Sequence, residues 1–566
     1  MGVIRRVGIE KGSAMSGLSS AGGSRTVSAN VASSAKKMGL MAIILLGING
    51  IVGSGAFLLP QEIYKDAGFL LGIATLLASG LATLFIVFCY ADLAGKIPGS
   101  GGGWLYCYAA WGRFTGFQVG IFVWFAGLAT ISTEVAALVR VFQNLIPALK
   151  DNKWLAFGCG AALIVVLALI NMAGPTFVQM VDNISSGAKI ATAAFVVIAG
   201  AFFLKAANFK PMIPTDVHSF GGGFDAVKAA YGVTFYLFAG FSFLTIAGGR
   251  MKNSQKDLPK ALLIVILAVT VIYVAIQFIT VGNLGADTAN STIPVAEAMH
   301  KAMGEWAYYL VVSGTVVSIF GVCFACSFEV PILGASLATE HRLLPPFIGK
   351  TNRRGAPVVA IIITAVLSIG VLATGDYVFL ATCVVCASAV QYIPTILAAV
   401  KLRKTAPADG AFTLKPAVRW VIVVLALVAS SYLFLSFNLE VLVVCAIVLA
   451  VGLILYFFDR KRTQQPGQEI RIGKIFSHPM PTRAGAAVID RLAFGRLLGH
   501  RHPLPAPPET LGSVIDDADV AVAAAKSAAE EATSRASAVA TKIAPTENAA
   551  QPQEVAHDEV EGTDND

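Results

Sequence analysis

Charged residues are scarce in this sequence: they make up 13% of its 566 residues, while 56% are hydrophobic. Soluble domains carry about 25% charged residues, so the composition argues against a soluble globular protein. About twelve apolar runs are near or above the roughly 20 residues that a membrane-spanning helix needs. They lie at roughly 39–60, 69–95, 116–147, 153–173, 182–204, 228–249, 258–283, 303–338, 356–374, 376–400, 418–437 and 439–458. We therefore expect an all-α membrane protein that crosses the bilayer many times.

The sequence also lacks the motifs of nucleotide-driven pumps, enzymes and channels. Its glycine-rich stretch at 99–103 has no Gly-Lys-Ser/Thr ending, which a phosphate-binding loop uses to hold a nucleotide. The loops show no nucleophile beside a general base, and the sequence has no selectivity-filter repeat. We expect neither an ATP-driven pump nor an enzyme nor a channel, and no cofactor.

Cysteines are few, and four of the eight form two C-x-x-C pairs, Cys323/Cys326 and Cys383/Cys386, inside apolar runs. A zinc site would need deprotonated ligands and a second pair nearby in space. We interpret these thiols as packing groups and expect no metal site. Redox or metal chemistry is the alternative.

The net charge of +8 is not placed as a nucleic-acid surface would be. With the N-terminus inside, most Lys and Arg residues fall in inner loops, among them Lys96, Arg250 and Arg353, and the outer loops hold about seven. This distribution predicts a cell (cytoplasmic) membrane protein with both termini in the cytoplasm. The first 38 residues have no apolar segment ahead of a small-residue cleavage site, so we expect no cleaved signal peptide.

Composition divides the chain into four segments. Residues 1–38 are rich in Ser, Gly and Ala and are expected to form a flexible cytoplasmic arm, and residues 39–462 hold the apolar runs. Residues 463–506 are basic and suit an interfacial helix on anionic lipid or a short helix packed on a cytoplasmic loop. Residues 507–566 are acidic and Ala-rich with almost no aromatics, which predicts a disordered cytoplasmic tail.

The first apolar run is interrupted by Gly53-Ser54-Gly55 near mid-span, although each glycine weakens a helix by about 1 kcal/mol. Unwound backbone survives in hydrocarbon only where protein or a water-filled cavity surrounds it. The freed N–H groups of these three residues would hold a carboxylate at the N-terminus of the following half-helix. The interruption therefore predicts a binding site.

The sixth apolar run has a matching interruption around Ala239-Gly240. Two broken runs at equivalent positions of two five-helix halves indicate an inverted repeat with a site at mid-membrane. Carbonyl groups near Ile51 and Ala239 would accept hydrogen bonds from an ammonium group, so the two breaks together suit an α-amino acid. Close helix packing is the alternative explanation for the glycines.

Four motifs in the same order resemble one family. The stretch from Gly50 to Pro60 looks like the first-helix motif of the amino acid–polyamine–organocation (APC) permeases, and the stretches 97–106, 238–259 and 343–357 are similar to further motifs of that family. The resemblance covers roughly residues 36–462. It implies about twelve transmembrane helices in a LeuT-like five-plus-five inverted repeat, with helices 1 and 6 unwound at mid-membrane, and secondary transport of amino acids or related amines.

The resemblance also implies roles for individual residues. Gly53, Ser54 and Gly55 match positions that bind the substrate carboxylate, and Ile51 and Ala239 match backbone contacts to its amino group. An aromatic residue that helps to cover the substrate corresponds to Tyr236. The complete predicted substrate-binding set is Ile51, Gly53, Ser54, Gly55, Tyr236, Ala239, Gly240, Ser242 and Glu134.

Lys189 resembles the helix-five lysine whose ammonium group takes the place of a sodium ion in sodium-driven relatives, which implies sodium-independent transport. A lysine at the bilayer centre costs about 3 kcal/mol on insertion scales. Snorkelling of this side chain to the membrane interface is the alternative.

Two positions depart from the family. Ser242 stands where many relatives have an acid, which puts a coupling role of that position in doubt. Glu134 lies mid-helix where the aligned relative is apolar, and we hypothesise that it faces a cationic side chain or takes part in proton movement. The alternative is a buried structural pair with a lysine, an arginine or a hydroxyl, and a structural role is the stronger interpretation of Glu329.

The sequence thus predicts a secondary transporter of amino acids or amines, working as an antiporter or a proton-linked symporter. A membrane nutrient sensor that uses the C-terminal tail as its output is the alternative. The expected partners are the substrate and the lipid bilayer; protons and a homodimer stay open, and no nucleic acid is expected.

Overall fold

The computed structural model describes residues 39–460, apart from 98, 100, 173–174, 214–219, 247–250, 340–341 and 375. Every element in that part of the chain is an α-helix or a short 3-10 turn, so the all-α prediction is confirmed. The segments expected at 1–38, 463–506 and 507–566 lie outside the described residues.

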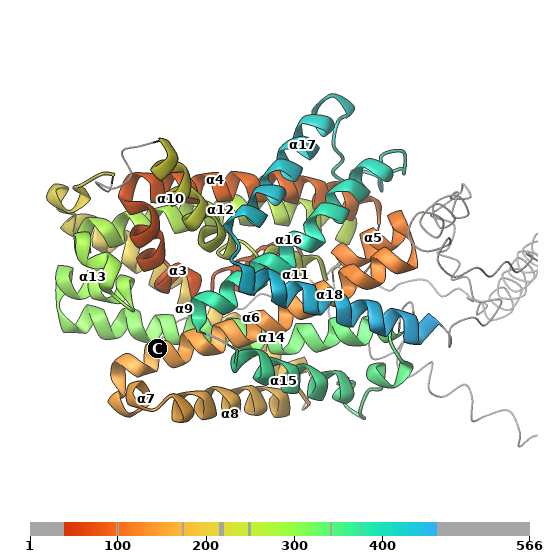
Figure 1. Cartoon of the computed structure of the whole chain (residues 1–566), viewed down its shortest axis with the longest axis horizontal. Coiled ribbons are helices and arrows are strands. Elements are labelled where there is room, and N and C mark those ends of the chain that lie inside the picture. Colours follow the sequence, from red (N-terminus) through yellow and green to blue (C-terminus); the bar gives the residue numbers. More distant parts are fainter. Residues whose placement is uncertain are drawn as a thin grey trace, which may run out of the picture. The chain divides into compact units, whose positions relative to one another are not determined.

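All of the predicted apolar runs form helices (Figure 1). The described part of the chain has ten helices long and apolar enough to cross a membrane, and two shorter apolar ones, α2 (Leu40–Ile51) and α15 (Val358–Leu372). The other helices of the bundle are α4 (Pro60–Lys96), α6 (Arg113–Leu145), α8 (Lys153–Met172), α9 (Pro175–Gly200), α10 (Phe220–Tyr236), α12 (Ser254–Leu284), α14 (Glu305–Thr339), α16 (Tyr377–Lys401), α17 (Pro416–Tyr432) and α18 (Leu439–Arg460).

Two short helices show the internal repeat. They are α5 (Gly103–Trp111), between α4 and α6, and α13 (Pro294–Met303), between α12 and α14. Each ends at a glycine with almost the same backbone angles: Gly112 has φ 87° and ψ −168°, and Gly304 has φ 88° and ψ −170°. Glycine adopts this region at no steric cost. The two short helices lie at opposite ends of the bundle (Figure 1), as an inverted repeat requires.

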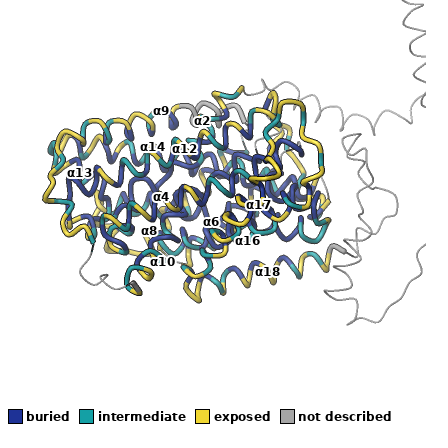
Figure 2. The backbone as a smooth tube through the Cα atoms, turned by 90° about the horizontal axis from the view of Figure 1, so that it is seen from above, coloured by how far each residue is buried: buried dark blue, intermediate teal, exposed yellow. Residues whose placement is uncertain are grey.

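Equivalent helices of the two halves pack against each other: α4 contacts α12, α6 contacts α14, and α8 contacts α15. The interior is formed by buried residues of helices such as α6, whereas most residues of α17 and α18 are not buried (Figure 2). Their exposed side chains include Val424, Val428 and Ile447. Apolar side chains on the outside suit contact with lipid tails.

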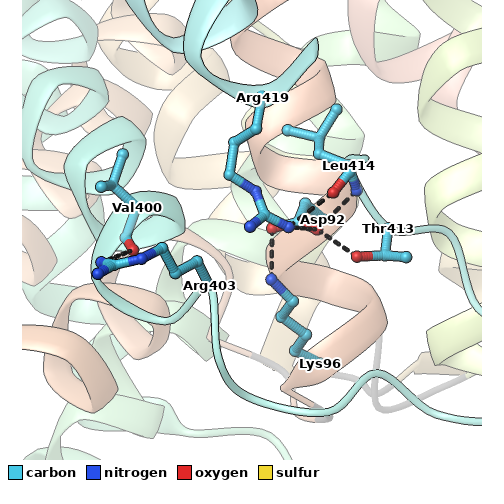
Figure 3. A network of polar contacts seen from close by, with 7 residues as sticks. All are labelled: Asp92, Lys96, Val400, Arg403, Thr413, Leu414 and Arg419. Carbon is cyan, nitrogen blue, oxygen red and sulfur yellow. Dashed lines mark hydrogen bonds and ion pairs between the residues drawn. The ribbon is translucent and has the colours of Figure 1, made fainter. Parts of the chain in front are cut away.

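A buried ion cluster joins the end of α4 to the segment before α17 (Figure 3). The carboxylate of Asp92 accepts hydrogen bonds from Lys96 Nζ at 2.6 Å, Thr413 Oγ1 at 2.9 Å and the Leu414 amide at 2.9 Å. Arg419 Nη2 lies 3.8 Å from Asp92 Oδ1 and donates to the Leu414 carbonyl at 2.7 Å. Two cations and two neutral donors therefore hold this carboxylate.

Candidate functional site

Both predicted interruptions are present in the structure. The first falls after α2, where Val52 leaves the helix with φ −79° and ψ 92°, and α3 (Gly55–Leu58) begins at Gly55. The second is a turn at 237–240 between α10 and α11 (Phe241–Ile246). Helices 1 and 6 of the predicted repeat are thus unwound as expected.

The two interruptions lie against each other. A Cβ atom on Gly240 would collide with the carbonyl oxygen of Gly50, so only glycine permits this close approach. The buried hydroxyl of Tyr273, on α12, lies 2.9 Å from the Ile51 carbonyl oxygen and 3.0 Å from that of Leu237. Because a tyrosine has one O–H proton, the two carbonyls share it. Tyr273 was not predicted; its only signal is a hydroxyl inside an apolar run.

Glu134, on α6, extends to the first interruption and is only 3% exposed. Its carboxylate accepts hydrogen bonds from the Ser54 amide at 3.0 Å and from the Ser54 hydroxyl at 2.9 Å. A Cβ atom on Gly53 would lie 2.7 Å from Glu134 Oε1, so the carboxylate packs directly on that glycine. A carboxylate of the chain itself therefore lies at the Ser54 N–H, one of the three that were predicted to hold the substrate.

Two tyrosines contact this pair, one at Glu134 and the other at Ser54. Tyr236 donates to Glu134 Oε1 at 2.9 Å, and Tyr377 places its hydroxyl 3.1 Å from the Ser54 hydroxyl. The two rings are perpendicular, with centroids 6.4 Å apart, and the guanidinium carbon of Arg140 lies 5.8 Å from the Tyr377 ring centre. Tyr236 was predicted to belong to the site; Tyr377, at the first turn of α16, was not.

Lys189, on α9, is fully buried, so its side chain does not snorkel to an interface. Its ammonium group donates to the carbonyl oxygens of Asn49 and Val52, both at 2.8 Å. The hydroxyl of Ser318, on α14, lies 3.4 Å from the same Val52 oxygen. These carbonyls lie at the broken end of α2, where helical partners are missing, and the ammonium group satisfies them.

Ala239 lies in the turn of the second interruption, and Ser242 lies in the first turn of α11. The Ser242 hydroxyl donates to the Ala239 carbonyl at 3.4 Å, so this bond stays within its own turn. Both residues are buried. Glu329 is half-buried on α14, and its role stays a prediction.

The cysteines of the two C-x-x-C pairs are all free and buried. Cys386 Sγ lies 2.8 Å from Cys445 Sγ of α18, so its sulfur neighbour comes from another helix. Among the residues that the structure describes, no three His, Cys, Asp or Glu side chains are grouped to hold a metal ion.

The family model of amino acid permeases matches residues 38–458, which is most of the chain. The chain belongs to the amino acid permease family. The resemblance to APC permeases, its extent and the LeuT-like fold class are thereby confirmed. As a member of this family with membrane-spanning helices, the chain is a multi-pass membrane protein of the transporter class, and the family indicates transport of amino acids.

Several curated relatives of this permease carry transporter names. The chain is 27% identical over 302 residues to cationic amino acid transporter 9 (chloroplastic) of Arabidopsis thaliana, an alignment that covers 50% of the chain and about half, 52%, of that relative. It is 26% identical over 449 residues to the branched-chain amino acid permease BcaP of Bacillus subtilis, covering 76% of the chain and 94% of the relative. An uncharacterized transporter of Mycobacterium tuberculosis is 27% identical over 403 residues, with 66% and 82% covered.

Proposed function

We propose that this permease is a secondary active transporter that moves amino acids or related amines across the cytoplasmic membrane by alternating access. It works without sodium, as an antiporter or a proton-linked symporter. The observation that supports this most directly is the carboxylate of Glu134 on the amide and hydroxyl of Ser54. Donors that hold one carboxylate in a buried site have the geometry to hold that of an amino acid.

Recognition of the substrate backbone would use both interruptions. The N–H groups of Gly53, Ser54 and Gly55 face a carboxylate at the start of the half-helix, and the carbonyls of Ile51 and Ala239 accept from the ammonium group. The Ile51 carbonyl shares the Tyr273 hydroxyl with Leu237, and a carbonyl oxygen has a second lone pair for another donor. These groups recognise what all amino acids share, so side-chain selectivity lies with Glu134, Tyr236, Ser242 and their neighbours.

Sodium independence is supported by the contacts of Lys189. Its ammonium group is bonded to two backbone carbonyls, with a serine hydroxyl beside one of them. Carbonyl and hydroxyl oxygens at a broken helix are the ligands that transporters of this architecture offer to sodium ions. An ammonium group held by the same oxygens would take over that stabilising role.

The Lys/Arg excess in the inner loops supports an orientation with both termini in the cytoplasm.

The two driving modes differ in the gradient that drives uptake. An antiporter needs a second amino acid or amine on the far side, whereas a proton-linked symporter responds to a pH gradient. A protonatable Glu134 at the site is compatible with the second mode.

The test is uptake by the purified full-length protein in liposomes. Because the relatives are named for cationic and branched-chain amino acids, the probes are labelled L-lysine, L-arginine and L-leucine, with and without sodium, a pH gradient or internal amino acid. We expect saturable uptake that choline in place of sodium leaves unchanged. Uptake that requires sodium would contradict the role of Lys189, and absence of uptake under every gradient would contradict the transporter proposal itself.

A further inference from the structure

The donors around Glu134 are the ones that a substrate carboxylate needs. The Ser54 amide, the Ser54 hydroxyl and the Tyr236 hydroxyl all bond its two oxygens at 2.9–3.0 Å. The Ser54 amide and hydroxyl lie at the first interruption, and Tyr236 is the last residue of α10, directly before the second. An amide N–H and a hydroxyl each carry one proton to donate. Two carboxylates cannot use these donors at the same time.

We infer that Glu134 is a built-in competitor for the substrate's carboxylate: binding of an amino acid requires that its carboxylate displaces that of Glu134 from Ser54. This inference rests on the proposed function, since it assigns a role to a residue of the same site. It differs from direct recognition, in which Glu134 would only attract the substrate.

The packing at Gly53 supports mutual exclusion. Glu134 Oε1 lies close enough that a single added methyl carbon would come within 2.7 Å of it. No second carboxylate fits between that glycine and Oε1. Two unit negative charges at about 4 Å also repel each other strongly inside a protein. The substrate must therefore move the Glu134 carboxylate away, or fail to contact Gly53 and Ser54.

Displacement is feasible because of how Glu134 is held. Its hydrogen bonds come from uncharged donors, and its side chain has rotatable bonds between a rigid helix and the carboxylate. An amino acid brings its own ammonium group into the site together with its carboxylate. The displaced glutamate thus gains a cationic neighbour as it loses Ser54, so the exchange does not leave a buried charge unpaired.

The competition gives different results for two classes of ligand. An amino acid has to displace Glu134, so its apparent dissociation constant is the intrinsic one divided by the fraction of sites in which Ser54 is free of Glu134. A decarboxylated amine leaves Ser54 to Glu134 and gains from the nearby negative charge. Removing the Glu134 carboxylate should therefore tighten the binding of amino acids and weaken or leave unchanged the binding of amines.

The test measures equilibrium binding to the full-length protein in detergent for two pairs of probes, L-lysine with cadaverine and L-leucine with 3-methylbutylamine. The variants are Glu134→Ala, Glu134→Gln, which keeps the shape, and Glu134→Asp, which keeps the charge on a shorter arm. Glu440→Gln, at an exposed glutamate of α18, is the matched control. If Glu134 holds Ser54 nine-tenths of the time, Glu134→Ala tightens amino acid binding about tenfold, with smaller tightening in Gln and Asp.

The sign of the change in amino acid affinity decides the inference. Tightening in the Glu134 variants, absent in Glu440→Gln and absent for the amines, supports competition. Weaker binding of amino acid and amine alike shows that Glu134 is a direct ligand of the substrate's cation and overturns the inference. Unchanged amino acid affinity in all three variants also overturns the inference. If one variant does not elute as a folded, monodisperse protein, the result is taken from the other two. Wild-type protein that binds and transports no amino acid would contradict the proposed function instead.

Discussion

Two buried carboxylates of this permease are held in opposite ways. Asp92, at the end of α4, is fully buried and has the ammonium group of Lys96 at 2.6 Å and the guanidinium group of Arg419 at 3.8 Å (Figure 3). Glu134 is almost as buried, but its hydrogen bonds come from the uncharged groups of Ser54 and Tyr236. Asp92 links the end of α4 to the segment before α17, while Glu134 contacts residues at both helix breaks.

The difference concerns what happens to the neighbouring groups when the carboxylate moves away from them. A buried carboxylate with cationic partners cannot leave without stranding their charges, which costs several kcal/mol. A carboxylate held by neutral donors leaves groups that another carboxylate can take over. We therefore assign Asp92 to the stability of the fold and Glu134 to exchange with ligand.

The largest expected effect is on stability, in Asp92→Asn. The variant keeps the size of the side chain but leaves Lys96 and Arg419 without their buried counter-charge, so the free energy of unfolding should fall by about 3–5 kcal/mol. Thermal unfolding of the purified protein in detergent measures this. Asp225→Asn, which breaks the exposed pair with Lys228 (Asp225 side chain 71% exposed), is the control and should change stability by about 0–1 kcal/mol.

The double variant Asp92→Asn, Lys96→Met refines this result. Removing the ammonium group as well takes away one stranded charge, so part of the lost stability should return. Equal melting temperatures for Asp92→Asn and Asp225→Asn would show that the cluster is not structural, and the contrast with Glu134 would disappear.

An intermediate effect is expected on transport, in Gly53→Ala. The added methyl carbon would lie 2.7 Å from Glu134 Oε1 and fill the space that either carboxylate needs. Overpacking of this kind costs about 1–3 kcal/mol, so the initial rate of amino acid uptake in liposomes should fall by about fivefold to a hundredfold. Gly50→Ala is the matched control, because a Cβ atom there meets nothing within 4 Å. A similar loss in both variants would mean that the helix break, and not the carboxylate space, limits uptake.

The sequence predicted the parts of the site that depend on local chemistry. Glycines inside apolar runs predicted both helix breaks, because glycine weakens a helix. Glu134 and Lys189 stood out because a charged side chain inside an apolar run is costly in hydrocarbon. Their partners could not be read from spacing. Glu134 and Tyr236 are 102 positions apart in the chain, and Lys189 and Asn49 are 140 apart.

Such contacts depend on how the helices of the bundle pack, not on any local pattern. Tyr273 shows this most clearly, since nothing in the apolar run around it distinguishes a hydroxyl that bridges two helix breaks from one that faces solvent. The same limit applies to Glu134. The resemblance predicted that it lies near the substrate, but its position on the Ser54 donors follows only from the placement of α6 at the first interruption.

The smallest expected effect distinguishes the two carboxylates most directly, by removing one hydroxyl donor from each. Ser54→Ala takes a donor from Glu134, and Thr413→Val takes one from Asp92. Each loses one hydrogen bond, so each should lower the free energy of unfolding by about 1 kcal/mol. Only Ser54→Ala should also raise the KM for amino acid uptake, because we propose that Ser54 also binds the substrate carboxylate. Loss of that bond alone would raise the KM about fivefold, but Glu134 is then held less firmly as well, so the net rise should be smaller. A rise in KM in Thr413→Val of the same size would place the Asp92 cluster in the transport cycle and remove the distinction drawn between the two carboxylates.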